Sequence, residues 1–255
     1  MNTVTPAKVS LLNIFVLESI SELKRLIRTP AFSLPTILFP VMFYVFFGVI
    51  FAKNPTSAPT YLMITYCVFG IVGPALFSFG VGIAVERGQG WFNLKEVSPM
   101  PASAYVISRV VLSGLFAAII ITILFAIGSL IGNVNLATTQ WLSLSGIFIL
   151  GSLPFCAIGL TLGLMLKSNS AAAIINLIYL PMSFLSGLWI PINMMPGFLQ
   201  QFANVLPPYH LAQLALKVTD MDVGGSVIKH ITILVAYSVL FSFLAIKAYY
   251  RKNKG

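Results

Sequence analysis

Long runs of apolar residues divide this chain, and they restrict its fold more than any other feature. A hydrocarbon core about 30 Å thick is crossed by about 20 apolar helical residues. Six runs of about this length occupy residues 33–52, 61–85, 105–132, 141–166, 171–190 and 227–248. Only 8% of the residues are charged, whereas soluble domains are about 25% charged. We therefore predict an all-α integral membrane protein with six transmembrane helices in a single transmembrane domain, residues 1–255.

The residues before the first run have the pattern of an amphipathic helix. Apolar side chains recur on one stripe and charged side chains on the opposite side. The apolar stripe holds Leu12, Val16, Ile20, Leu23 and Ile27, and the charged side holds Glu18, Glu22, Arg25 and Arg28. Such a helix lies in the plane of the membrane interface. We predict an interfacial helix over residues 9–29.

The basic residues orient the six predicted spans. Of the 15 Lys and Arg residues, all but Lys53, Lys217 and Lys229 fall on one side of the membrane. Short cytoplasmic loops are enriched in Lys and Arg, so we expect both termini and the loop 86–103 to be cytoplasmic, in the cell's inner membrane. The segment 191–225 then forms an outward re-entrant hairpin. Lipid headgroups and orientation account for the net charge of +9, and we expect no nucleic-acid partner.

The loop 86–103, ERGQGWFNLKEVSPMPAS, is unlike the rest of the chain. Within it, Trp91, Phe92, Leu94 and Val97 recur at nearly helical spacing. This composition favours a short helix that docks against another protein. The alternative is a solvated loop whose aromatic residues rest on the lipid interface, where Trp is common.

The remaining side chains offer little chemistry. The six acidic residues lie outside the predicted hydrocarbon zone, whereas ion-driven carriers need an ionisable group at depth. His210 and His230 are expected near the outer surface without matched partners, so we predict no metal or catalytic site. Cys67 and Cys156 fit small core residues. The chain has no phosphate-binding GxxxxGK[ST] motif, so any energy from ATP must come through another chain.

Two GxxxG pairs, Gly128 with Gly132 and Gly159 with Gly163, favour close helix packing. We expect packing within the chain for each; a dimer seam is the alternative.

Two segments resemble the membrane subunit of ABC-2 type ATP-binding-cassette exporters, and the resemblance covers nearly the whole chain. Residues 185–211, LSGLWIPINMMPGFLQQFANVLPPYHL, are similar to the family's outer segment before the last span. The Glu-Arg-Gly of residues 86–88, followed by Leu94, Pro99, Pro101 and Arg109, resembles its first cytoplasmic loop. Many relatives continue this motif with Thr and further charges, whereas here residues 89–92 read Gln-Gly-Trp-Phe.

The resemblance implies a membrane-spanning exporter subunit that is not itself an enzyme. Two ABC ATPase subunits would dock on the cytoplasmic side and bind ATP and Mg, and this chain would hold no cofactor. A second permease copy, identical or closely related, would pair with it in the lipid. The implied ATPase-coupling residues are Glu86, Arg87, Gly88, Trp91, Phe92, Leu94 and Lys95. The implied external gate comprises Gly187, Pro191, Met194, Met195, Pro196, Phe198 and Pro207.

Spans without predicted buried charge suit an apolar or amphipathic substrate better than an ion. Family members export drugs, antibiotics or lipid-linked molecules. The candidate path residues are Phe69, Phe77, Phe79, Asn176, Tyr179 and Phe184, although core packing explains the same aromatics. Two other functions stay open: a non-transporting membrane scaffold, and a secondary carrier or channel.

Overall fold

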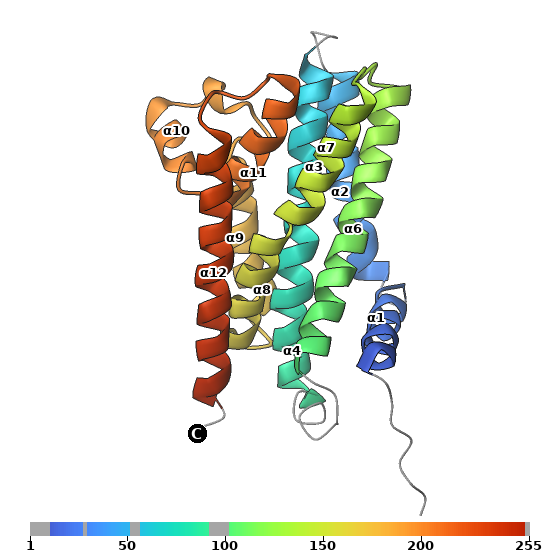
Figure 1. Cartoon of the computed structure of the whole chain (residues 1–255), viewed down its shortest axis with the longest axis vertical. Helices are drawn as coiled ribbons and strands as arrows, with labels where there is room; N and C mark the ends of the chain where they lie inside the picture. The colour runs from blue at the N-terminus through green and yellow to red at the C-terminus, as the bar shows by residue number, and fades with distance from the viewer. Residues whose placement is uncertain (1–10, 28–29, 52–56, 92–101, 253–255) are drawn as a thin grey trace, which may run out of the picture.

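Side-by-side helices run along the long axis of the computed structural model (Figure 1). It describes residues 11–27, 30–51, 57–91 and 102–252, and these contain helices and connecting turns but no strand. The prediction of an all-α membrane protein is confirmed.

The N-terminal helix α1, Leu11–Ile27, lies at one end of the bundle and packs against α6 (Figure 1). Val16, Leu17 and Ile20 leave an apolar face exposed, as expected of a helix at the lipid interface. One feature differs from the expectation: Glu22, predicted on the polar side, is buried. The polar side of α1 is therefore partly turned toward the protein.

The helices of the six apolar runs are as follows. The first run forms α2, Pro30–Phe43, and the π-helix η1, Tyr44–Ile50. The second forms α3, Ala58–Leu76, the π-helix η2, Phe77–Val81, and α4, Gly82–Gly88. The third is α6, Ala102–Leu130. The fourth comprises α7, Thr138–Gly151, and α8, Leu153–Met165. The fifth is α9, Ala171–Leu185, and the last is α12, Val227–Lys252.

Four of these runs are long and apolar enough to cross a membrane, and two are shorter. The shorter ones are Leu34–Ile50 and Ala171–Leu185. The helix α9 ends five residues before the predicted boundary because the chain turns at Gly187, whose φ of +77° favours glycine. Pro181 lies inside a continuous α9.

The fourth run, predicted as one helix, is two. The break falls at Ser152, and Pro154 stands in the first turn of α8. Proline lacks the N–H needed to continue the hydrogen-bond ladder of the preceding helix, so a break here is expected.

Helix α3 is the centre of the bundle. In the continuous helix Ala58–Gly88, which includes α3, 78% of the most apolar stretch is buried inside the protein. The corresponding fraction for α12 is 11%. Gly159 and Gly163 of α8 allow close approach, because a Cβ at these positions would lie 2.9 Å from the Ala75 carbonyl and 2.5 Å from the Phe79 carbonyl. At Gly128 and Gly132 a Cβ would collide with Met63 and the Tyr44 hydroxyl. Both GxxxG pairs therefore serve packing within the chain, as predicted.

The segment before α12 folds at the end of the bundle opposite α1 (Figure 1). It contains η3, Ile192–Met194, α10, Gly197–Ala203, α11, Pro207–Leu216, and η4, Lys217–Thr219. We call residues 192–219 the α10–α11 segment. Pro207 and Pro208 begin α11, since proline suits the first helical turn.

Candidate functional site

A buried ion cluster lies at the α1 end of the bundle, and Arg109 is its centre. Arg109 comes from α6 and is fully buried. Its guanidinium pairs with the Glu86 carboxylate of α4 and lies 3.5 Å from the Glu22 carboxylate of α1. It also donates to the backbone carbonyl of Ser78 in η2. One side chain thus joins α1, η2, α4 and α6.

Two local features position the guanidinium. Gly82 lies beneath it, and a Cβ there would stand 2.5 Å from Nη1 of Arg109. The guanidinium carbon lies 4.8 Å from the centroid of the Tyr105 ring, which is within the range of a cation–π contact. The planar fork of arginine can serve several acceptors at once, whereas a lysine ammonium is a point charge.

The same cluster closes the base of the loop 86–103. Glu86 stands at the start of that loop, and Tyr105 and Arg109 follow its end. The Tyr105 hydroxyl donates to Oε2 of Glu86 over 2.6 Å. A displacement of the loop is therefore transmitted to both α4 and α6 and, through Glu22, to α1.

Arg87 and Gly88 also make internal contacts. The Arg87 guanidinium donates to the backbone carbonyls of Gly163, Leu164 and Leu166 at the end of α8. A cation at a helix C-terminus satisfies free carbonyls and the helix dipole. A Cβ at Gly88 would lie 2.6 Å from Cβ of Ser168. The Glu-Arg-Gly motif thus fastens α4 to α6 and α8.

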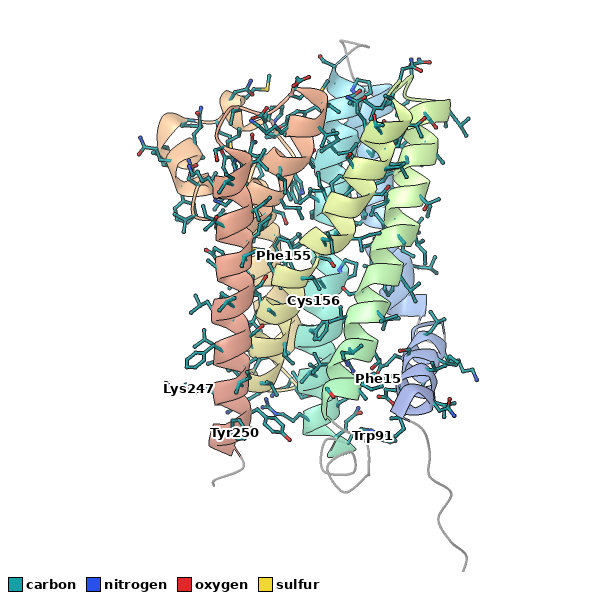
Figure 2. The ribbon with its side chains drawn as sticks, in the orientation of Figure 1. Phe15, Trp91, Phe155, Cys156, Lys247 and Tyr250 are labelled. Carbon is teal, nitrogen blue, oxygen red and sulfur yellow. The ribbon has the colours of Figure 1, made fainter. Side chains whose placement is uncertain are left out.

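These contacts change the interpretation of the predicted coupling residues. Glu86 is buried, so it does not offer its carboxylate to a docked protein. Trp91, in contrast, is 53% exposed and lies at the α1 end of the molecule (Figure 2). Phe92, Leu94 and Lys95 lie outside the described residues.

The ion cluster also corrects the expectation that the spans hold no buried charge. Arg109, in the third predicted span, is buried together with Glu22 and Glu86. The hydropathy of the sequence does not reveal this burial. The only hint in the sequence is that Glu86 and Arg109 stand on either side of one loop. Among the described residues, no three His, Cys, Asp or Glu side chains gather as a metal site.

Residues 15–219 match the ABC-2 type transporter family. The chain belongs to this family. It is also 32% identical over 239 residues to YvfS of Bacillus subtilis (strain 168), across 92% of this chain and 96% of that protein. YvfS is described provisionally as a transport permease. The chain is accordingly a transporter permease of the ABC-2 type, and its family implies association with an ABC ATPase subunit.

In this ABC-2 permease, four of the six predicted path residues lie in one aromatic cluster. The ring of Tyr179 stacks on Phe69 at 5.0 Å and meets Phe77 edge-on at 6.0 Å. Trp189 lies 5.6 Å from Phe69 and 6.1 Å from Phe184. The sequence prediction missed Trp189, because it was assigned to the end of a span.

The other two path residues lie apart from these contacts. Phe79 is buried in the core beside Gly159, so packing accounts for it. Asn176 is exposed on α9. Tyr179 has a structural role as well, since its hydroxyl donates to the Phe69 carbonyl over 2.9 Å.

The predicted gate residues divide into buried anchors and exposed side chains. Met195 and Pro207 are buried, and Met195 packs with Ile192, Ala203 and Tyr209 in a small core of its own. The exposed group is Met194, Pro196 and Phe198, while Pro191 is half-buried. The chain turns at Gly187, where an added Cβ would lie 3.0 Å from Cβ of Ile192, the first residue of the α10–α11 segment.

Two further sequence predictions, on the cysteines and on the histidines, can also be compared. Cys67 and Cys156 are buried free thiols, as predicted, and Cys156 lies in the middle of the bundle (Figure 2). The prediction that His210 and His230 lack matched partners is wrong. The two rings are buried and hydrogen-bonded to each other.

Proposed function

We propose that this permease is the membrane subunit of an ATP-driven exporter, energised by ABC ATPase subunits that dock at the α1 end. The observation that carries the proposal is the ion cluster at the base of the loop 86–103. A docking loop can move helices only if its base is rigidly attached to them. Glu86, Tyr105 and Arg109 provide that attachment between α4 and α6.

The cluster suits this role because buried ion pairs resist separation. Removing one partner from a buried pair typically costs about 3–5 kcal/mol. The group formed by Glu22, Glu86 and Arg109 is therefore expected to move as one body. Displacement of the loop by an ATPase would then shift α1, α4 and α6 together, while the Arg87 contacts would carry the displacement to α8.

The exposed Trp91 is the proposed contact with the ATPase. Large aromatic side chains that become buried at an interface often dominate its binding energy. Phe92, Leu94 and Lys95, whose structure is not described, complete the proposed docking loop. The ATPase subunits, two per transporter, would bind ATP and Mg. A second permease copy, identical or closely related, would complete the pathway in the cell's inner membrane.

The proposed substrate is a hydrophobic drug-like compound or a lipid-linked molecule that moves outward. The aromatic cluster of Phe69, Phe77, Tyr179, Phe184 and Trp189 supports this choice, because aromatic faces accept apolar groups. The buried charges of the ion cluster are paired with one another at the α1 end. This arrangement favours a structural role over the ion relay of a secondary carrier.

Co-purification tests the docking proposal. We expect Trp91→Ala combined with Phe92→Ala to weaken binding of the ATPase, since each aromatic anchor contributes about 2 kcal/mol, or roughly 30-fold in affinity. The matched control is Phe202→Ala, which removes an exposed aromatic ring at the opposite end and should leave ATPase binding unchanged. Wild-type recovery of the ATPase with the double variant would reject docking through these residues.

The substitution Glu86→Gln tests the attachment of the loop 86–103 to the helices separately from the docking of the ATPase. The amide can still accept from the Tyr105 hydroxyl but loses the ion pair with Arg109. We expect the ATPase to bind normally while substrate-stimulated hydrolysis falls. Loss of both properties would instead indicate that the variant has lost its fold, and unchanged stimulation would show that the ion pair does not transmit the motion.

A further inference from the structure

The two histidines of the chain meet at the end of the bundle opposite α1. His210 belongs to α11 and His230 to the first turn of α12, and both rings are buried. Their Nδ1 atoms lie 2.8 Å apart, and Nε2 of His210 lies 2.9 Å from the backbone carbonyl of Asn204. The pair thus joins three points: the end of α10, α11 and α12.

The hydrogen bonds determine the position of each proton. A carbonyl only accepts, so Nε2 of His210 must carry the hydrogen that it donates to Asn204. Neutral His210 then has a lone pair on Nδ1. The hydrogen between the rings must therefore come from Nδ1 of His230, because a 2.8 Å separation holds only one hydrogen.

One ring nitrogen remains available. Nε2 of His230 is buried and makes no hydrogen bond to the described residues. It faces the turn before α12, where a Cβ at Gly225 would lie 3.1 Å away and where φ is +105°. In the neutral pair this nitrogen carries a lone pair that no donor occupies, so it is the first site that an added proton would occupy.

Burial and the neighbouring cations disfavour that proton, whereas the backbone carbonyl of Gly224 favours it. The ring of Tyr209 meets both histidine rings edge-on, at 5.3 Å and 6.3 Å between centroids. The charged groups around the pair are Lys217, Asp222 and Lys229, and Asp222 is already paired with Lys217 at 3.0 Å. A protonated ring would therefore be buried close to two lysines, one of which is already paired with the nearby carboxylate. Burial lowers the pKa of His210, the charge of Lys229 lowers it further, and the Asn204 carbonyl acts in the opposite direction.

We propose that His210 and His230 form a proton-binding latch, which holds the α10–α11 segment on α12 when neutral and releases it when acid protonates the pair. The Tyr237 hydroxyl, which donates to the Val205 carbonyl over 2.6 Å, is a second tie between the same elements and does not titrate in this range. Acid therefore loosens the segment without detaching it fully. The latch is independent of what the permease transports.

The pH dependence has a definite sign. The buried pair takes up a proton less readily than free histidines, whose pKa is about 6.5, so the unfolded or released segment binds more protons in acid. Stability of the latch is complete above about pH 6.5 and is lost as the pH falls toward the folded pKa. Between about pH 6.5 and the folded pKa, each pH unit weakens closure by up to about tenfold for one proton taken up on release, and below the folded pKa the closure depends no further on pH.

Nitrogen-15 NMR of the ring nitrogens is a direct test, because the chain contains only two histidines. In protein labelled with ¹⁵N-histidine and reconstituted in nanodiscs, we expect one Nε2–H tautomer and one Nδ1–H tautomer at neutral pH. The two rings should titrate together, below the usual histidine range. Two Nε2–H tautomers, or two independent titrations near pH 6.5, would overturn the proposal.

Hydrogen exchange over residues 204–230 tests the mechanical consequence. Wild type should be protected at neutral pH and lose protection in acid, after correction for the intrinsic exchange rate. His230→Asn places an amide nitrogen where Nδ1 stood, so it keeps the donor and removes the titrating ring; it should stay protected at both pH values. His230→Gln places its amide near the Nε2 position and should be less protected at both. Equal acid sensitivity of wild type and His230→Asn would contradict the latch.

Discussion

Replacement of Arg109 by methionine probes the ion cluster most sharply. The substitution keeps much of the side-chain volume but removes the fork that serves Glu86, Glu22 and the Ser78 carbonyl. Two buried carboxylates then lose their counter-charge, which is expected to cost about 3–5 kcal/mol. For a chain of this size we expect the apparent melting temperature to fall by about 10 °C.

Thermal unfolding of the permease in nanodiscs, followed by loss of monodisperse protein, measures this change. Lys24→Met is the matched control, since it makes the same replacement at an exposed position of α1 and should change stability by no more than about 0.5 kcal/mol. Adding Glu86→Gln to Arg109→Met should restore part of the loss, about 1–3 kcal/mol, because one uncompensated charge is removed. The reasoning is refuted if Arg109→Met melts no lower than Lys24→Met, or if Glu86→Gln lowers its stability further.

Three further outcomes follow from individual contacts. Gly163→Ala should lower stability by about 1–3 kcal/mol by colliding with the Phe79 carbonyl, whereas Gly146→Ala, with no atom within 4 Å of the new Cβ, should be neutral or stabilising; thermal unfolding compares them. Arg87→Gln should speed amide exchange over residues 163–170, because the end of α8 loses a charge-assisted cap worth about 1–3 kcal/mol, while unchanged exchange would contradict that role. In cells, Asn193→Cys in a background with Cys67→Ala and Cys156→Ala should react with an impermeant thiol reagent, and labelling only after lysis would reject the outward orientation of the α10–α11 segment.

The helices could be predicted from the sequence because their determinants are local. Apolar length identified the runs, and the alternation of apolar and charged residues identified α1. The ends of the helices were harder, since they depend on single residues. Gly187 ends α9 early through its positive φ, and Pro154 divides the fourth run, whereas Pro181 is accommodated inside α9.

The side-chain clusters depend on contacts that sequence spacing does not encode. Arg109 and Glu22 are 87 residues apart along the chain, and hydropathy places each at a membrane boundary without linking them. His210 and His230 lie only 20 residues apart, but the turns between α11 and α12 decide whether their rings meet. The aromatic residues of the second and fifth runs are the easier case, since the sequence predicts both Phe69 and Tyr179 as path residues and their rings stack on each other.

ATP-dependent transport by the assembled complex tests the central claim most directly. The permease would be reconstituted in inside-out vesicles with the ABC ATPase that co-purifies with it, and uptake of fluorescent amphiphiles and of inorganic ions would be followed. We predict that an amphiphile accumulates only with ATP and Mg, and that an ATPase variant unable to hydrolyse ATP abolishes the uptake. ATP-dependent movement of an inorganic ion, with no response to any amphiphile, would contradict the account.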